Sequence, residues 1–151
     1  VGARASGSTR DSRKDIGYGI YDELDFEVIT ETAGDVEARI KVRIGEVAQS
    51  LKLVRQLISK LRRNAETQLA VELGELQQEE GHFTWGISES ARGDNLHCLL
   101  LDKEGRIDRL FVRSASYPNW PALTVAVQGD IIPDFPLINK SFELCYACID
   151  R

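Results

Sequence analysis

The sequence predicts an α+β fold that combines one long amphipathic helix, a small antiparallel β meander and short C-terminal helices. Apolar residues recur every three or four positions through residues 35–63, which is the period of a helix. Three short apolar runs separated by turn-forming residues occupy 83–113, a pattern typical of strands joined by hairpins. The 151 residues suit a single domain, in which 1–34 is irregular and 120–151 is a helical tail.

The first segment is rich in glycine, serine and arginine, and its glycines predict irregular structure. Its basic side chains have two open explanations: a solvated loop, or pairs with buried acids or with another subunit. These side chains are Arg4, Arg10, Arg13 and Lys14. Residues 22–28 alternate apolar and polar side chains toward their end, which predicts a short strand.

Nine apolar side chains define one face of the long helix: Val36, Ile40, Ile44, Val47, Leu51, Val54, Leu57, Ile58 and Leu61. Asp35 is the expected N-cap, and Lys60 and Arg62 lie at the end where positive charge is favoured. At about 1.5 Å per residue the helix is on the order of 40 Å long. That length suits one strut of a larger helical bundle. The residues after it, 68–80, are compatible with either a strand or a helix.

The predicted strands are 83–87, 96–101 and 107–112, with a loop over 90–95. In such a meander the Arg92 loop and the segment 113–116 lie at the same end of the sheet. Two polar segments that terminate strands are thereby brought together. Farther along, residues 122–127 predict a short apolar helix closed by Gly129, and Asp134 with Pro136 begins a second helix.

Composition excludes several classes of protein. The net charge of −5 argues against nucleic-acid binding, which requires a basic face. No apolar run approaches the roughly 20 residues that span a bilayer. Three cysteines, two of them in a CxxC pair, make no disulfide framework and favour metal or redox chemistry.

Cys145 and Cys148 form the CxxC pair, and their spacing lets both thiolates reach one metal ion. Zinc sites usually take four ligands, and only one such pair is present. Cys98 lies in an apolar run and is expected to be a buried small hydrophobe. His82 and His97 could complete a zinc site, but their spacing fits no common pattern. Taken alone, the pair leaves metal ligation and structural or incidental thiols open.

Three stretches resemble the C-terminal part of the nickel-iron hydrogenase large subunit: SARGDNLH at 90–97, RSASYPN at 113–119 and ELCYACIDR at 143–151. The resemblance is strongest to the membrane-associated, energy-converting group with the formate hydrogenlyase, carbon-monoxide-induced and Ech enzymes. The opening GARASG and DSRKDIGYGIYDELDFEV also resemble that group and the related 49 kDa quinone-site subunit of complex I. The resemblance implies a fragment of the large-subunit fold, and we expect a piece of a longer polypeptide.

The resemblance also implies residue roles. Cys145 would be a terminal nickel ligand and Cys148 would bridge nickel and iron, in a centre that also carries cyanide and carbonyl ligands. Arg92 would lie over the metal beside the substrate and an iron-bound cyanide, and the Ser116 hydroxyl would hydrogen-bond a cyanide. Glu143 would handle protons beside the metal. The alternatives are a solvated turn arginine for Arg92 and an ordinary exposed carboxylate for Glu143.

Two departures from the family pattern stand out: Glu143-Leu144 replaces Asp-Pro before the first cysteine, and Ala91 replaces the proline before the arginine. The family pattern continues to a final His or Arg, which here is Arg151. The family holds its metals with four cysteines, whereas this chain has one CxxC. The isolated chain is therefore expected to lack the centre and to be inert.

The expected partners are the N-terminal part of a large subunit carrying the first CxxC, an iron-sulfur small subunit and membrane-arm subunits. The expected location is cytoplasmic, at the inner face of the cell membrane. The assembled oxidoreductase would interconvert dihydrogen with protons and electrons. Two alternatives remain: a complex-I-like quinone oxidoreductase subunit, which usually lacks the two cysteines, and a zinc-stapled structural or interaction domain.

Overall fold

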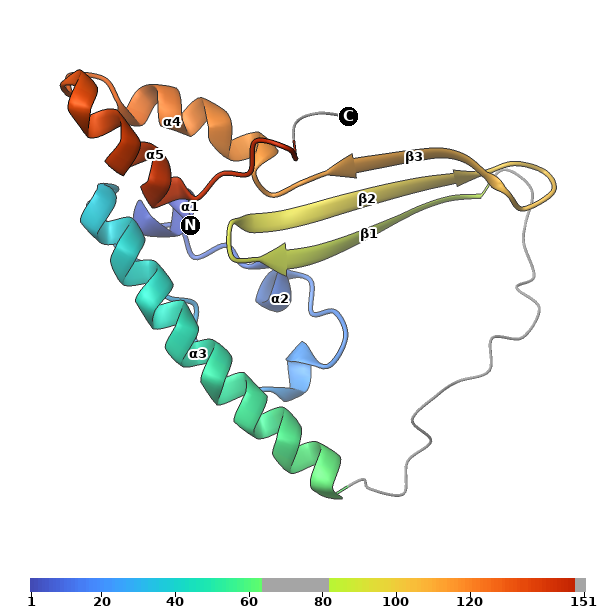
Figure 1. Cartoon of the computed structure of the whole chain (residues 1–151). Coiled ribbons are helices and arrows are strands. Elements are labelled where there is room, and N and C mark those ends of the chain that lie inside the picture. The colour runs from blue at the N-terminus through green and yellow to red at the C-terminus, as the bar shows by residue number, and fades with distance from the viewer. Residues whose placement is uncertain (64–81, 149–151) are drawn as a thin grey trace.

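The computed structural model describes residues 1–63 and 82–148, and within them the fold is α+β, as predicted. Residues 68–80, for which strand and helix were both open, lie outside the described ranges, as does Arg151. The elements are α1 (Gly2–Ala5), α2 (Ser12–Asp15), the 3-10 helix η1 (Tyr21–Glu23), α3 (Val36–Arg63), β1 (Phe83–Ser90), β2 (Gly93–Leu101), β3 (Ile107–Arg113), η2 (Tyr117–Asn119), α4 (Trp120–Ala126), η3 (Ile132–Asp134) and α5 (Phe135–Phe142). Figure 1 shows α1 and α5 close to the start of α3. From this region α3 and the sheet extend in different directions.

The predicted long helix is present as α3. Asp35 caps its first turn, because the Asp35 carboxylate accepts a hydrogen bond of 2.7 Å from the Ala38 N–H. One side of α3 packs on the N-terminal segment in two clusters, Ala38 and Val42 against Ala5, and Leu53 against Leu24 and Phe26. The segment before α3 therefore doubles back along the helix.

The strand predicted at 22–28 is wrong, because side chains of α3 satisfy the backbone that a neighbouring strand would pair. Gln56 accepts from the Asp25 N–H at 2.9 Å and donates to the Asp25 carbonyl at 2.7 Å. Gln49 accepts from the Glu27 N–H at 3.2 Å. The prediction that residues 1–34 are irregular is also wrong in part, since α1, α2 and η1 each form a single turn there.

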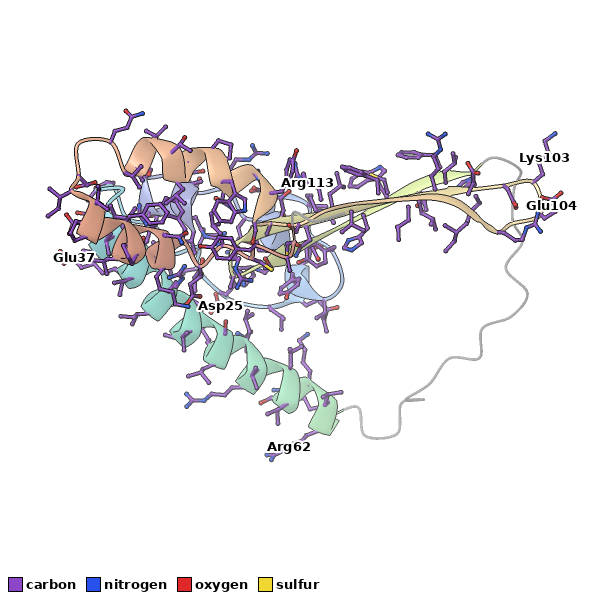
Figure 2. The ribbon with its side chains drawn as sticks, turned by 45° about the horizontal axis from the view of Figure 1, so that its top comes forward. Asp25, Glu37, Arg62, Lys103, Glu104 and Arg113 are labelled. Atoms are coloured by element: carbon purple, nitrogen blue, oxygen red, sulfur yellow. The ribbon has the colours of Figure 1, made fainter. Side chains whose placement is uncertain are left out.

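The meander is a three-stranded antiparallel sheet of order β1-β2-β3. Its first turn is shorter than the predicted loop over 90–95, since only Ala91 and Arg92 separate β1 from β2. Gly93 accepts the unusual φ of +132° that this turn requires. Cys98 is half-buried rather than buried, since its register neighbours Trp85 and Phe111 lie on a sheet face left largely exposed. In Figure 2 the far turn, with Lys103 and Glu104, projects away from the helices.

The C-terminal helices α4 and α5 enclose a small core of Leu123, Ile138, Phe142 and Leu144. The predicted helical tail to residue 151 is too long, because α5 ends at Phe142. Glu143 then takes a left-handed conformation with φ of +51° and turns the chain toward the sheet. No helix within the described ranges is both long and apolar enough to cross a membrane.

Arg39 of α3 holds this C-terminal unit in place. Its Nε–H donates to the Ser141 hydroxyl at 2.8 Å, and its terminal nitrogen donates to the Gly34 carbonyl at 2.7 Å. The guanidinium carbon also lies 4.1 Å from the centroid of the Phe142 ring. These contacts fix the end of α5, and therefore the start of the segment that carries the two cysteines.

Candidate thiol site

The two cysteines lie where polar segments from three parts of the chain meet, and we call Cys145, Cys148, Arg92 and Ser116 the thiol site. The antiparallel register brings the Arg92 turn and the residues after β3 to one end of the sheet, as predicted. Three hydrogen bonds fix this end. The Ala115 N–H donates to the Asn95 side chain at 2.9 Å, and the Asn119 amide donates to the carbonyls of Ala115 and Arg92 at 2.6 and 3.0 Å.

Two serines of this end hold the backbone of the cysteine segment. The Ser116 hydroxyl is buried, with 2% of the residue exposed, and accepts from the Cys145 N–H at 3.0 Å. The Ser114 hydroxyl donates to the Cys148 carbonyl at 3.4 Å. A hydroxyl that accepts one bond still has its own proton to donate. Ser116 therefore positions the backbone of Cys145 and can still donate its own proton.

Arg92 connects the β1–β2 turn with the residue before the cysteines. Its Nε–H donates to the carbonyl of Glu143. The half-buried side chain lines two hollows of about 450 and 410 Å³, one toward α1 and α2 and one toward α5 and Tyr146. The Glu143 carboxylate instead lies 3.7 Å from Lys140 and 3.9 Å from Arg43, and it is partly exposed. The structure therefore places Glu143 at the site through its carbonyl.

The two thiols are half-buried and hydrogen-bonded to each other. That hydrogen bond lowers the pKa of Cys145, with help from the Cys148 backbone N–H and from the positive charge of Arg92. The same bond between the thiols raises the pKa of Cys148. Cys145 is therefore the thiol that ionises first and Cys148 the one that donates to it.

As a metal site, the CxxC pair supplies two soft donors. Within residues 1–63 and 82–148 no group of three or more His, Cys, Asp or Glu side chains is placed to hold a metal ion. His82, His97 and Cys98 thus do not complete a zinc site around the CxxC pair. Two adjacent thiolates fit a thiophilic metal such as nickel, provided that the remaining ligands come from elsewhere.

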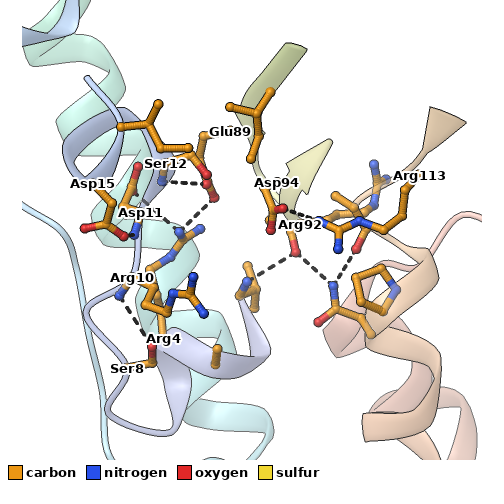
Figure 3. A pocket seen from close by; sticks show the side chains of 18 residues that line it. Arg4, Ser8, Arg10, Asp11, Ser12, Asp15, Glu89, Arg92, Asp94 and Arg113 are labelled. Carbon is orange, nitrogen blue, oxygen red and sulfur yellow. Dashed lines mark hydrogen bonds and ion pairs between the residues drawn. The ribbon is translucent and has the colours of Figure 1, made fainter. Parts of the chain in front are cut away.

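A buried ionic cluster behind the Arg92 turn was not identified as such from sequence (Figure 3). The Arg4 guanidinium lies 2.7 Å from Glu46 of α3, 2.9 Å from Glu89 of β1 and 3.5 Å from Asp11. Glu89 also accepts from the Ser12 N–H at 3.1 Å. Arg4 thereby ties α1, α2, α3 and β1 together just before the turn that carries Arg92.

Of the two explanations for the N-terminal basic residues, pairing with buried acids is correct for two of them. Arg4 is buried, and Arg13 lies 2.6 Å from the buried Asp11 carboxylate. Arg10 and Lys14 are exposed. The one available signal was the arginine set among small residues in GARASG, where close packing leaves a long side chain little access to solvent.

Comparison with known proteins gives concordant matches. A family model for the 49 kDa subunit of the respiratory-chain NADH dehydrogenase matches residues 1–80 and 74–151. Formate hydrogenlyase subunit 5 of Escherichia coli (strain K12) is 36% identical, and the match covers 98% of this chain and 25% of that protein. A NADH-quinone oxidoreductase subunit of Salinispora tropica is also 36% identical, over 99% of this chain and 38% of that protein.

Among solved structures, a chain of the membrane-bound sulfane sulfur reductase, an archaeal respiratory membrane complex, superposes with a TM-score of 0.85. It is 28% identical, and the match covers 98% of this chain and 41% of that chain. The chain thus spans between 25% and 38% of the length of the two curated relatives.

Proposed function

The chain belongs to the family of the 49 kDa subunit of the respiratory-chain NADH dehydrogenase, and on this premise we propose that it is the C-terminal part of an energy-converting nickel-iron hydrogenase large subunit. Cys145 and Cys148 supply two of the four thiolates of the nickel-iron centre. The assembled complex interconverts dihydrogen with protons and electrons, and the isolated chain is inactive.

One observation carries this proposal: the CxxC pair meets Arg92 and Ser116 at one end of the sheet. Three separate stretches of the sequence resemble the hydrogenase pattern, at residues 90–97, 113–119 and 143–151. In the fold the Arg92 side chain bonds the residue two positions before Cys145, and Ser116 bonds Cys145 itself. A metal centre with small ligands needs this convergence of soft donors, a cation and a hydroxyl.

Each residue of the thiol site has a distinct task in this proposal. When bound, the nickel-iron centre supplies the redox chemistry of dihydrogen. Ser116 and Ser114 hold the backbone of the cysteine segment, which orients both sulfur atoms. The group that holds or releases a proton in this proposal is a thiolate, such as the Cys145 sulfur, or Arg92. Arg92 keeps positive charge beside that sulfur and favours its thiolate.

The proposed partners are the other parts of a membrane-associated hydrogenase complex. The N-terminal part of the large subunit supplies the first CxxC, and an iron-sulfur small subunit carries the electrons. Membrane-arm subunits anchor the complex at the cytoplasmic face of the membrane. Matches to a formate hydrogenlyase subunit and to a chain of a respiratory membrane complex support assembly with other subunits.

The test is the metal content of the large subunit purified in its complex. Cys148→Ser is expected to lower bound nickel at least tenfold and to abolish hydrogen uptake, because a serine hydroxyl is a poor ligand for a thiophilic metal. Cys98→Ser is the matched control: it removes the third cysteine, on β2, and is expected to leave nickel and uptake unchanged. Normal nickel in Cys148→Ser would refute the ligand assignment.

The 36% identity to a NADH-quinone oxidoreductase subunit favours one second candidate, a complex-I-like subunit whose metal site is vestigial. The same complex distinguishes the two. Stoichiometric nickel in the unaltered protein supports the hydrogenase, whereas quinone reduction without nickel supports the second candidate. Zinc held by this chain alone, and lost with unfolding in Cys145→Ala, would contradict both and identify a structural domain.

A further inference from the structure

Asn119, the last residue of η2, is not a member of the thiol site but contacts two residues that are. Its side-chain amide donates to the Arg92 carbonyl at 3.0 Å and to the Ala115 carbonyl at 2.6 Å. Its backbone N–H donates to the Ser116 carbonyl at 3.1 Å. One half-buried residue thus connects the backbone of Arg92 with that of Ser116.

The side chain at position 119 must be an amide to make these bonds. Both of its partners are carbonyl oxygens, which can only accept, so each takes one of the two N–H donors of the amide. Aspartate has nearly the same shape but no donor when it is ionised, and leucine has neither donor nor charge. Asn119 is also the N-cap of α4, yet its side chain does not cap that helix. The amide therefore serves the Arg92 turn and the segment after β3 rather than α4.

The turn that carries Arg92 is short. Only Ala91 and Arg92 connect β1 with β2, and Ala91 is exposed. The Arg92 carbonyl also accepts from the Val1 nitrogen, but at the longer distance of 3.5 Å. From this turn the Arg92 Nε–H reaches the carbonyl of Glu143, two positions before Cys145. A shift of the turn would therefore move the guanidinium relative to the Cys145 sulfur.

We propose that Asn119 is a positioning residue, which determines where the Arg92 guanidinium lies beside Cys145 by tying the Arg92 turn to the Ser116 segment. The inference rests on the proposed function, in which that cation acts at the metal centre. A misplacement of about 1 Å can cost on the order of 100-fold in rate, even from a change far from the reacting atoms. The metal ligands should stay in place, because Ser114 and Ser116 still hold the cysteine backbone.

Hydrogen uptake and nickel content of the intact complex test this role. Asn119→Asp and Asn119→Leu both remove the two donors, and only the first adds a charge. Each is expected to lower kcat for hydrogen uptake by about 10- to 100-fold and to leave KM and bound nickel unchanged. Gln128→Glu is the matched control, because it makes the same amide-to-carboxylate change at an exposed residue after α4. It should leave all three quantities unchanged.

A double-mutant cycle shows whether Asn119 acts through Arg92. Arg92→Lys keeps the positive charge but loses the planar guanidinium, and it is itself expected to lower kcat. In that background Asn119→Asp should lower kcat by less than about twofold more, since the position that Asn119 determines is already lost. Two effects that multiply in the double variant would overturn the proposal, and so would normal kcat in both Asn119 variants.

Hydrogen exchange of residues 90–95 in the same complex does not depend on the metal. It therefore separates failure of this inference from failure of the proposed function. Exchange there is expected to accelerate at least about tenfold in both Asn119 variants and to stay unchanged in Gln128→Glu. An unaltered complex without nickel or hydrogen uptake would refute the proposed function, whereas faster exchange in it would still support the tether. Unchanged exchange at 90–95 would overturn the tether whatever the metal content.

Discussion

Arg4 is surrounded by three carboxylates, and burial and hydrogen bonding shift the pKa values of two of them in opposite directions. Asp11 is buried, which opposes its ionisation, but hydrogen bonds and charge from Arg13, with a further contribution from Arg4, lower its pKa overall. Burial raises the pKa of Glu46 although Arg4 lies 2.7 Å away. The cluster thus contains one carboxylate that is held ionised and one whose charge is disfavoured.

Asp11→Asn is expected to lower the free energy of unfolding at pH 7 by about 2 kcal/mol, because Arg13 and Arg4 lose a buried counter-charge. The pKa of Asp11 is lower in the folded chain than in the unfolded one, where it is about 4. Its contribution is therefore complete above about pH 4 and is lost as the pH falls through the lower, folded value. Urea unfolding of both proteins at pH 7, 5 and 3 measures the difference.

The control for this series is Asp108→Asn, which removes an exposed carboxylate of β3 and should leave stability at pH 7 unchanged. A difference between the Asp11 proteins that stays constant down to pH 3 would show that the Asp11 charge plays no part.

At the scale of the elements, the sequence determines where α3 begins, whereas packing against the N-terminal segment determines which of its faces is buried. Gly45 marks the point of closest approach, because a Cβ there would lie 2.7 Å from Cγ2 of Ile29. Glycine is otherwise the second poorest residue for a helix interior, about 1 kcal/mol worse than alanine. Its presence is explained by the need for the N-terminal segment to run directly against the helix backbone.

Gly45→Ala is expected to destabilise the chain by about 1–2 kcal/mol, because overpacking against Ile29 exceeds the gain in helix propensity. In Gly45→Ala with Ile29→Ala the clash disappears, so the combined loss should be smaller than the sum of the single losses. Chemical denaturation measures all three variants. Ser50→Ala, on the exposed side of the same helix, is expected to be neutral or slightly stabilising. A stabilised Gly45→Ala would mean that the segment does not approach the helix this closely.

At the scale of the whole molecule, the thiol site is held by elements that are far apart in the chain. Arg39 near the start of α3 bonds Ser141 near the end of α5, 102 residues later. This contact and the packing of Val36 on the core of α4 and α5 join the C-terminal helices to α3, and the cysteine segment continues from α5. A change at Arg39 should therefore loosen the C-terminal unit while the rest of α3 stays folded.

Arg39→Lys keeps the positive charge but loses the planar fork that donates to two acceptors and stacks on Phe142. Hydrogen exchange of α4 and α5 is expected to accelerate at least tenfold, equivalent to about 1.4 kcal/mol, with α3 beyond Leu53 unaffected. Arg55→Lys, exposed on α3, serves as the control. Uniform acceleration along the whole chain would instead indicate global destabilisation. Unchanged exchange in α4 and α5 would show that Arg39 does not hold these helices against α3.

Part of the thiol site could be predicted, because the order of strands and turns in a meander determines which segments lie at the same end of the sheet. The alternation of strands and turns places Arg92 and Ser116 at one end of the meander whatever surrounds them. The path of the cysteine segment could not be predicted, since the left-handed turn at Glu143 occurs at a residue type that ordinarily avoids it. The Arg4 cluster was likewise hidden, because its carboxylates come from three separated parts of the chain.

By itself the sequence determined the elements: the α3 helix from its period and its cap, the meander from its strands and turns, and the pair of thiols from two cysteines. These features depend on interactions between residues close in the chain, which leave a regular pattern. Only the tertiary structure decided which face of α3 is buried, that glutamine side chains replace a strand at 22–28, and that the cysteines rest on Ser114 and Ser116. Those outcomes depend on contacts between distant segments, where burial and hydrogen bonding are satisfied collectively and no local pattern records the result.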